Sequence, residues 1–233
     1  MVADSHFREA WAGTANCAHC PTRDLSLFAN VPAADLDPEA CPVNHYKFSH
    51  GDTVYRSGER GHDLFCLRSG LLKLERFLPD GSKRIVRLVR PNDIFGLEVL
   101  LKPEYRHDAV ILQDAMLCRI NAGLVHELAE KNPVLHHDIM NRWQAALDEA
   151  DDWLTELVSG HARQRVARLL VRLSDHNAQC SLLSREDMGA LLSVTTETAS
   201  RAVAEFKRAG LIEEIGHNRY RCDLAGLEAV SVG

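Results

Sequence analysis

Three side chains near the C-terminus have the chemistry to read the edges of DNA bases. Glu197, Ser200 and Arg201 follow one another at i, i+3 and i+4, so a helix would carry them on one face. An arginine fork fits the O6 and N7 acceptors of guanine, a carboxylate accepts from the cytosine amino group, and a serine hydroxyl can donate or accept. Found alone, this spacing would indicate an ordinary Glu–Arg pair on a surface helix.

The residues around these three predict a helix-turn-helix. Ser184 and Asp187 are spaced as a capping box for a first short helix, and a turn at 193–195 leads into a second helix. Gly210 ends that helix, and residues 215–220 are typical of a short hairpin. The sequence thus predicts a winged helix-turn-helix whose second helix enters the major groove. The predicted DNA contacts are Glu197, Ser200, Arg201, Thr195, Thr196 and Thr198.

Charge and composition restrict the kind of DNA binding and the cellular setting. Residues 161–223 hold ten Lys or Arg against eight Asp or Glu, while the whole chain of 233 residues carries −6. Such a chain binds DNA through a local, salt-sensitive face and does not coat it. Residues 1–13 lack a signal peptide, no apolar run could span a membrane, and seven cysteines fit a reducing compartment. We therefore expect a cytoplasmic protein with no membrane partner.

The region from Tyr46 to Ile120 has an all-β pattern. Short apolar runs are separated by glycines, Gly70 among them, and Pro79-Asp80-Gly81 is a strong hairpin turn before a returning strand at 85–89. A compact barrel or roll is the predicted result.

A long helix is predicted from Pro133 to about Ser159. Its apolar residues recur at heptad spacing, which favours a coiled-coil seam and a parallel homodimer. A helix packed on its own β domain is the alternative, because Trp153 widens the apolar stripe. Gly160 is a plausible hinge before the next helix at 162–173. The predicted dimerisation residues are Met140, Trp143, Leu147, Ala150, Leu154 and Leu157.

The order of β-roll, long helix and winged helix-turn-helix resembles the CRP/FNR family of bacterial transcription regulators. The resemblance implies an α+β fold with a cyclic-nucleotide-binding-like jelly roll, and it covers nearly the whole chain. The implied parts are an N-terminal cysteine-bearing segment (1–26), the sensory roll (27–132), the dimerisation helix (133–160) and the DNA-binding domain (161–233).

The run Glu197-Thr198-Ala199-Ser200-Arg201 is similar to the E-x-x-S-R pattern of FNR-type members. In that branch the glutamate, serine and arginine read a TTGAT half-site. The resemblance therefore implies binding of double-stranded DNA at a TTGAT-N4-ATCAA-like palindrome, with RNA polymerase as a further partner. A palindrome also matches the two-fold symmetry of a dimer.

The roll departs from the pattern of members that bind cyclic nucleotides. Those use a Gly-Glu pair and a later Arg-Ser pair, whereas this chain has Gly96-Leu97-Glu98 and His107-Asp108. A carboxylate at Asp108 would repel a phosphate, so we do not expect cyclic AMP, unless Arg106 substitutes one place away. Haem-bearing members place ligands where Gly96 and Glu98 stand here, so haem is not expected either.

The oxygen-sensing branch provides the remaining comparison. Cys17, Cys20 and Cys118 are similar to three of its four ligands to a 4Fe-4S iron-sulfur cluster, but Ser26 stands where its third cysteine would be. Asp24 is the implied replacement, with His19 and Cys41 as alternatives. The resemblance thus implies redox or oxygen sensing through an N-terminal cluster.

Other interpretations of the cysteines stay open. The C-x-x-C could be a dithiol switch or half of a zinc site, and Cys118 could be a small core residue. A chain with no cofactor would be a constitutive or protein-regulated DNA-binding dimer. Cys66, Cys180 and Cys222 have no partners at ligand spacing and receive no role. A cupin-type enzyme would need an H-x-H ligand start, which the β segment lacks, so no enzymatic activity is expected.

Overall fold

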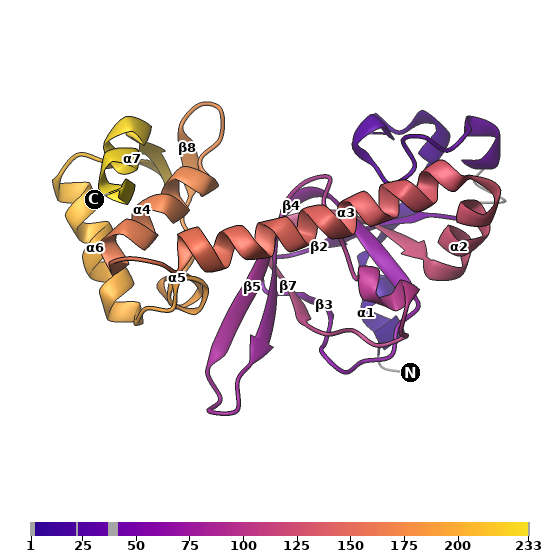
Figure 1. Ribbon diagram of the computed structural model, residues 1–233, viewed down its shortest axis with the longest axis horizontal. Helices are drawn as coiled ribbons and strands as arrows, with labels where there is room; N and C mark the ends of the chain where they lie inside the picture. Colours follow the sequence, from indigo (N-terminus) through magenta and orange to yellow (C-terminus); the bar gives the residue numbers. More distant parts are fainter. Residues whose placement is uncertain (1–2, 22, 37–41, 233) are drawn as a thin grey trace. The chain divides into compact units, whose positions relative to one another are not determined.

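The computed structural model describes residues 3–21, 23–36 and 42–232. The chain divides into two units, one formed by residues 1–76 and 86–147 and the other by 77–85 and 148–233. The first holds the large sheet and the second the helix-turn-helix, coloured orange to yellow in Figure 1. This is the predicted α+β class.

An antiparallel sheet forms the first unit. Its long central strand, β7, pairs antiparallel with β2, β3 and β4. The order is β1-β2-β7-β4-β5, with β3 also on β7 and β6 on β4, which confirms the predicted roll. The strands are β1 (Trp11–Thr14), β2 (Asn44–Phe48), β3 (Thr53–Tyr55), β4 (Asp63–Phe77), β5 (Lys83–Val89), β6 (Ile94–Phe95) and β7 (Asp108–Asn121).

Gly70 does not separate two strands, as the sequence pattern had suggested. Strand β4 runs through it, and the register with β7 shifts on both sides of it. Gly70 has a φ of 93°, and a Cβ there would lie 2.5 Å from the carbonyl oxygen of Asp114. The glycine therefore permits a bulge that bends a continuous strand. The hairpin predicted at Gly81 is present, with its amide donating to Leu78 O at 2.9 Å.

Aromatic rings fill the interior of the roll. Phe7, on the N-terminal helix α1 (Ala3–Ala10), stacks on Phe65 with ring centroids 5.8 Å apart. Tyr55 stacks on Tyr105 at 3.7 Å. Such burial holds the N-terminal segment against the sheet. That segment continues through the short 3-10 turns η1 (Cys17–His19), η2 (Arg23–Leu25) and η3 (Ala33–Leu36). A fourth 3-10 turn, η4 (Leu97–Leu100), follows β6 in the sheet region.

The long helix is shorter than predicted and ends in a wide turn. After α2 (Ala122–Lys131), which the sequence analysis did not identify, α3 spans Pro133–Asp152, and a π-helical turn, η5 (Trp153–Leu157), follows. Val158 N donates to Trp153 O at 3.2 Å, the i+5 bond of such a turn.

The π turn changes the apolar stripe. Met140, Leu147 and Leu154 are 51%, 55% and 69% exposed, Ala150 is exposed and Trp143 is half-buried. Leu157, by contrast, is fully buried, where η5 packs against α4. A π turn holds one more residue per turn than an α-helix, which shifts the register of the stripe, and Leu157 is not exposed for a dimer seam in this structure.

The second unit is a winged helix-turn-helix, as predicted. Helix α4 packs against α5, α6 and α7, and the strands pair in the order β8-β10-β9. Gly160, with a φ of 77°, precedes α4. The elements are α4 (Ala162–Leu173), β8 (Gln179–Ser181), α5 (Arg185–Leu192), α6 (Thr196–Arg208), β9 (Ile212–Gly216), β10 (Arg219–Cys222) and α7 (Leu224–Val232). None of the helices described is both long and apolar enough to cross a membrane.

Candidate nucleic-acid interface and cysteine cavity

Local contacts fix the turn between α5 and α6. Ser184 caps α5: its Oγ accepts from Asp187 N at 3.0 Å and donates to Asp187 Oδ2 at 2.7 Å. Ser193 adopts the left-handed conformation with a φ of 58°. A Cβ on Gly189 would lie 2.7 Å from Val194 O, so only glycine lets the turn fold back onto α5.

Helix α6 presents the three predicted side chains together. Ala199, Val203 and Phe206 are buried against the unit, while the opposite side carries Glu197, Ser200 and Arg201, all exposed. We call these three residues the reading face. Arg201 Nη2 lies 2.5 Å from Glu197 Oε1, and the two side chains are 78% and 71% exposed. An ion pair this exposed is weak, so both groups can turn to base edges at little cost.

The threonines predicted to contact DNA lie at the N-terminus of α6, where one of them also caps the helix. Thr195 is the N-cap of α6, and its Oγ1 accepts from Thr198 N at 3.1 Å and lies 2.8 Å from Thr198 Oγ1. Thr196 is exposed at the first turn. These residues place the helix N-terminus, a favourable position for a phosphate.

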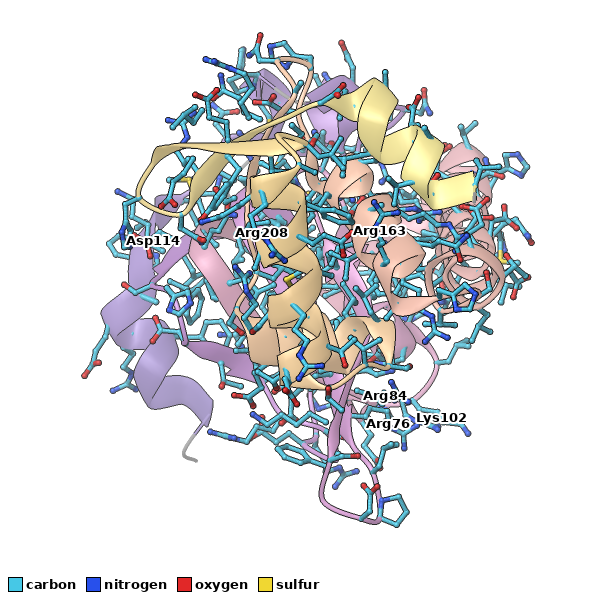
Figure 2. The ribbon with its side chains drawn as sticks, turned by 90° about the vertical axis from the view of Figure 1, so that its left-hand side faces the viewer. Arg76, Arg84, Lys102, Asp114, Arg163 and Arg208 are labelled. Atoms are coloured by element: carbon cyan, nitrogen blue, oxygen red, sulfur yellow. The ribbon has the colours of Figure 1, made fainter. Side chains whose placement is uncertain are left out.

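Several cations near α6 are paired with acids. Figure 2 shows Arg208 on α6 and Arg163 on α4. Arg163 Nε donates to Glu205 Oε1 at 2.8 Å, and Lys207 of α6 pairs with Glu214 of the wing strand β9 at 2.9 Å. Arg221 and Glu213 are 3.5 Å apart, whereas Arg219 donates to the amide oxygen of Gln179 at 2.7 Å. DNA phosphates must compete with these glutamates, so the surface is less basic than its Lys and Arg content suggested.

A cavity of about 200 Å³ lies beneath the N-terminal segment, and four cysteines line it. It brings together the predicted Cys17, Cys20 and Cys118 and adds Cys66, which the sequence analysis left without a role. We call it the cysteine cavity. Cys66 was missed because its closeness to Cys118 depends on strand register, not on spacing along the chain. The other lining residues are Ala15, Asn16, His19, Pro21, Ser26, Leu27, Phe28, Val43, His45, Arg68 and Ile120.

Burial controls the ionisation of these groups. It raises the pKa of the Cys66 thiol to about 12, helped by the neighbouring Cys118, and raises the pKa of Cys118 to about 11 against the opposing charge of Arg68. Burial and then Arg68 lower the pKa of His45. Arg68 Nη1 lies 2.7 Å from Cys20 Sγ. With these pKa values both thiols are protonated at neutral pH, and a bound metal would displace those protons.

The proposed replacements for the missing ligand are placed differently. Asp24 is exposed and does not line the cavity. Ser26 lines it, but its Oγ donates to Arg23 O at 2.8 Å and accepts from Phe28 N at 3.2 Å within its own turn. His19 Nδ1 lies 3.2 Å from Asn16 Oδ1. Cys41 lies outside the described residues.

The positions equivalent to a cyclic-nucleotide site are occupied by local contacts. Glu98 Oε1 accepts from Arg106 N at 3.1 Å and lies 4.0 Å from His107 Nδ1. Asp108 is buried, and its Oδ1 accepts from Ser57 N at 2.7 Å. Both carboxylates thus organise the roll's own loops.

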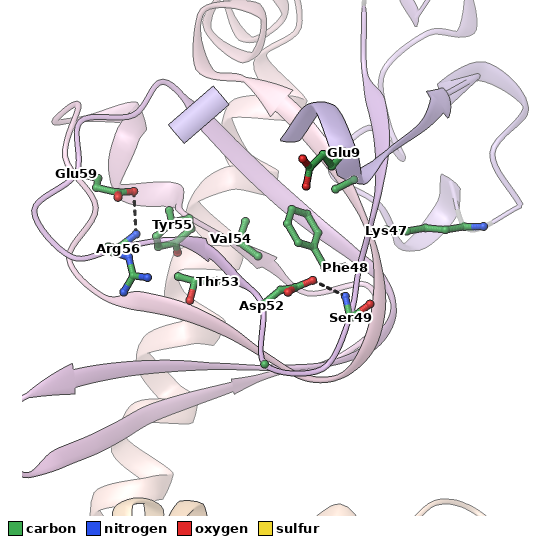
Figure 3. Close-up of a pocket in the computed structure, with 12 residues that line it drawn as sticks. Glu9, Lys47, Phe48, Ser49, Asp52, Thr53, Val54, Tyr55, Arg56 and Glu59 are labelled. Atoms are coloured by element: carbon green, nitrogen blue, oxygen red, sulfur yellow. Dashed lines mark hydrogen bonds between the residues drawn. The ribbon is translucent and has the colours of Figure 1, made fainter. Parts of the chain in front are cut away.

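A wider cleft of about 590 Å³ lies between α1, β2 and β3 (Figure 3). Two of its three carboxylates accept from nearby backbone amides: Asp52 Oδ2 accepts from Ser49 N at 2.7 Å and Glu59 Oε2 from Arg56 N at 3.0 Å, while Glu9 comes from α1. Asp52 and Glu59 thus close turns, and the described residues of the cleft form no metal-holding group.

Comparison with known proteins agrees with both units. Residues 46–132 match the family described as "Cyclic nucleotide-binding domain", and residues 164–230 match the "Crp-like helix-turn-helix domain". The regulatory protein HlyX of Actinobacillus pleuropneumoniae is 24% identical over 91% of this chain and 92% of its own length. The transcriptional activator FnrL of Cereibacter sphaeroides is 26% identical over 84% and 83%.

Solved structures share the fold. FixK2 from Bradyrhizobium japonicum superposes with a TM-score of 0.75 at 21% identity, covering 82% of this chain and 98% of its own. TTHB099, a CRP-family transcriptional regulator from Thermus thermophilus, has a TM-score of 0.69 at 26% identity, covering 80% and 96%.

The fold and the two domain matches thus define a DNA-binding transcription regulator with a cyclic-nucleotide-binding-type roll. The chain is of the CRP/FNR type, with FNR-like and HlyX-like relatives at low identity, and the proteins that it resembles are transcription regulators, not enzymes.

Proposed function

We propose that the protein acts as a homodimer that reads a TTGAT-N4-ATCAA-like inverted repeat and responds to oxygen or redox state through an iron-sulfur cluster. The observation that carries the DNA part is the reading face, with Glu197, Ser200 and Arg201 exposed together on α6. A dimer would present that face twice, matching the symmetry of the repeat. The proposed dimer contacts are Met140, Trp143, Leu147, Ala150 and Leu154.

The cysteine cavity supports the sensory part. The chemistry of its donors fits a cluster, because Cys17, Cys20 and Cys118 line one buried space beside a cation, Arg68. The described ranges contain no group of three or more His, Cys, Asp or Glu placed to hold a single metal ion. Zn–S bonds of ~2.3 Å would hold four sulfurs within ~4 Å of one another, and the described side chains form no such group.

When bound, an oxygen-labile cluster supplies a link between the N-terminal segment and the sheet that oxidation removes. The chain itself connects that segment to the proposed dimer helix. Asn30 Nδ2 donates to Asp138 Oδ2 on α3 at 2.8 Å, and Asn132 Nδ2 donates to Asn30 O at 3.0 Å. Leu27 and Phe28 share the roll's core with Leu135 of α3. Loosening of the segment would therefore act directly on the start of α3.

We further propose that cyclic AMP and haem are not the effectors and that RNA polymerase is the downstream partner. The engagement of Glu98 and Asp108 in loop contacts supports the first point. Isothermal titration with cyclic AMP should give no binding heat, and saturable binding would contradict this part of the proposal.

Two measurements test the main proposal. Gel-shift titration should show tighter binding to TTGAT-N4-ATCAA duplex than to a scrambled duplex of equal composition, and equal affinities would refute sequence reading. Protein purified without oxygen should contain iron and sulfide and show visible absorbance that bleaches in air. A colourless, iron-free protein that binds the repeat equally with and without air would instead be a constitutive regulator.

A further inference from the structure

The strand register places Cys66 beside Cys118 in the wall of the cysteine cavity. In the antiparallel pair of β4 and β7, Cys66 lies directly opposite Cys118, and on the other side of β7, His45 of β2 lies opposite Cys118. Residues directly opposite in an antiparallel pair have side chains on the same face, with Cβ atoms ~4.5–5.5 Å apart. The sheet therefore contributes a row of two thiols and an imidazole.

The N-terminal segment supplies the facing wall. Cys17 begins η1 and Cys20 is its C-cap, with Cys20 N donating to Cys17 O at 3.5 Å. All four cysteines line the same cavity of about 200 Å³. The sheet thus supplies two thiols and the N-terminal segment supplies two. The total of four is the number that ferredoxin-type clusters require.

Position 26 does not supply a competing ligand. The Ser26 hydroxyl is committed to Arg23 and Phe28, and a neutral hydroxyl is a poorer ligand for iron than a thiolate. Asp24 is exposed outside the cavity. The chain therefore has no available donor at position 26 but holds a thiol at position 66 on the opposite wall.

We propose that Cys66 is the fourth ligand, completing a Cys17, Cys20, Cys66 and Cys118 set for an iron-sulfur centre. This inference rests on the proposed function, since it assumes that the cavity holds such a centre. Four thiolates carry negative charge into a largely buried space. Arg68, with Nη1 2.7 Å from Cys20 Sγ, offsets that charge from within the cavity wall.

His45 is the rival donor. Its Nε2 is buried and has no hydrogen-bond partner among the described residues, and it lines the same cavity. A set of three cysteines and His45 would leave Cys66 as an ordinary core thiol. The choice between the two sets is open to direct test.

The test measures iron, acid-labile sulfide and zinc per chain in full-length protein purified without oxygen. The variants are Cys66→Val, which suits an apolar strand position, Cys66→Ser as a second replacement, and His45→Gln. Cys180→Ala is the matched control, because Cys180 is a buried cysteine of the wing sheet that contacts Cys222 at 3.5 Å. Thermal melting of each metal-free variant, compared with metal-free wild type, shows which variants keep the fold.

We expect iron and sulfide in wild type, His45→Gln and Cys180→Ala, and at least a several-fold loss in any Cys66 variant that melts like wild type. A folded Cys66 variant with wild-type iron content would overturn the assignment of Cys66 and leave the proposed function intact. Loss in His45→Gln with retention in Cys66→Val would transfer the role to His45. Wild-type protein with no iron would overturn both the inference and the proposed sensing, and zinc alone would replace the cluster with a zinc centre.

Discussion

The reading face and the cysteine cavity are opposite kinds of site. The reading face consists of three exposed side chains within five residues of one helix. The cysteine cavity is enclosed, and its cysteines come from η1, its C-cap, β4 and β7, spread over a hundred residues of chain. A surface site of the first kind can change its specificity without changing the fold. A site of the second kind exists only when the N-terminal segment is seated on the sheet.

This contrast suits a sensor joined to an effector. The reading face needs only a rigid helix, which Gly189 and the Thr195 cap provide. The N-terminal segment supplies part of the cavity wall, so a group held in the cavity would fix the position of that segment. Asn30 of the segment is hydrogen-bonded to Asp138 of α3. Under the proposed function, a change in the cavity would reach α3, the helix that carries the proposed dimer seam.

The largest effect should come from breaking the proposed dimer. A buried charge cannot be accommodated in an apolar seam, so Leu147→Lys should make the chain monomeric. Loss of one of two linked half-site contacts should weaken binding to the inverted repeat by about 100-fold or more. Analytical ultracentrifugation and gel-shift titration would measure both. Ala145→Lys, at an exposed position away from the stripe, is the control, and a dimeric Leu147→Lys would rule out this seam.

The next effect concerns the reading face itself. Arg201→Ala should lose ~1–3 kcal/mol of discrimination at the guanine of the half-site, about 5- to 150-fold in affinity. Binding to scrambled DNA should change much less. Fluorescence anisotropy with both duplexes provides the measurement, and Arg60→Ala, an exposed arginine of the roll unit, is the matched control. Wild-type affinity in Arg201→Ala would remove this side chain from the interface.

The next effect is on stability and leaves the DNA contacts themselves unchanged, because it concerns the turn that supports the reading face. Gly189→Ala places a methyl group 2.7 Å from Val194 O, so it should lower the free energy of unfolding of the second unit by ~1–3 kcal/mol. Gly216→Ala in the wing is the control, since its nearest neighbour would be 3.9 Å away. Urea unfolding followed by circular dichroism compares them. Equal stabilities would mean that the turn adjusts freely.

The smallest effect should be on the proposed coupling between the cysteine cavity and DNA affinity. Asn30→Ala removes the hydrogen bond to Asp138 while leaving the cysteines in place, so iron content should stay near wild type. The difference in DNA affinity between oxygen-free and aerated protein should shrink by a factor corresponding to ~0.5–2 kcal/mol. Asn141→Ala is the control, because Asn141 is exposed on α3, the helix that carries Asp138. An unchanged difference in Asn30→Ala would exclude this contact from the coupling.

The local parts of the molecule could be predicted from the sequence, whereas the long-range parts could not. Helical spacing identified α6 and its exposed side, and turn residues identified the Gly81 hairpin and the wing. Gly70 was misread because a glycine that breaks a strand and one that bends it give the same pattern. The π turn at Trp153, which buries Leu157, has no comparable signal in the heptad spacing.

The candidate sites followed the same division. Glu197, Ser200 and Arg201 are neighbours because of helix geometry alone, and the structure shows them as expected. Three cavity cysteines were identified by resemblance, but Asp24 lies outside the cavity and Cys66 lies within it. Only the pairing of β4 with β7 brings Cys66 to Cys118, and register is set by packing of the whole sheet.

The most direct test of the whole account is the affinity of one oxygen-free preparation for the TTGAT-N4-ATCAA duplex, measured by anisotropy before and after exposure to air. Coupling between the cysteine cavity and the reading face predicts a change of about 5- to 150-fold, the usual range for two linked sites. An affinity that is the same before and after aeration, in protein whose iron has been lost, would contradict it.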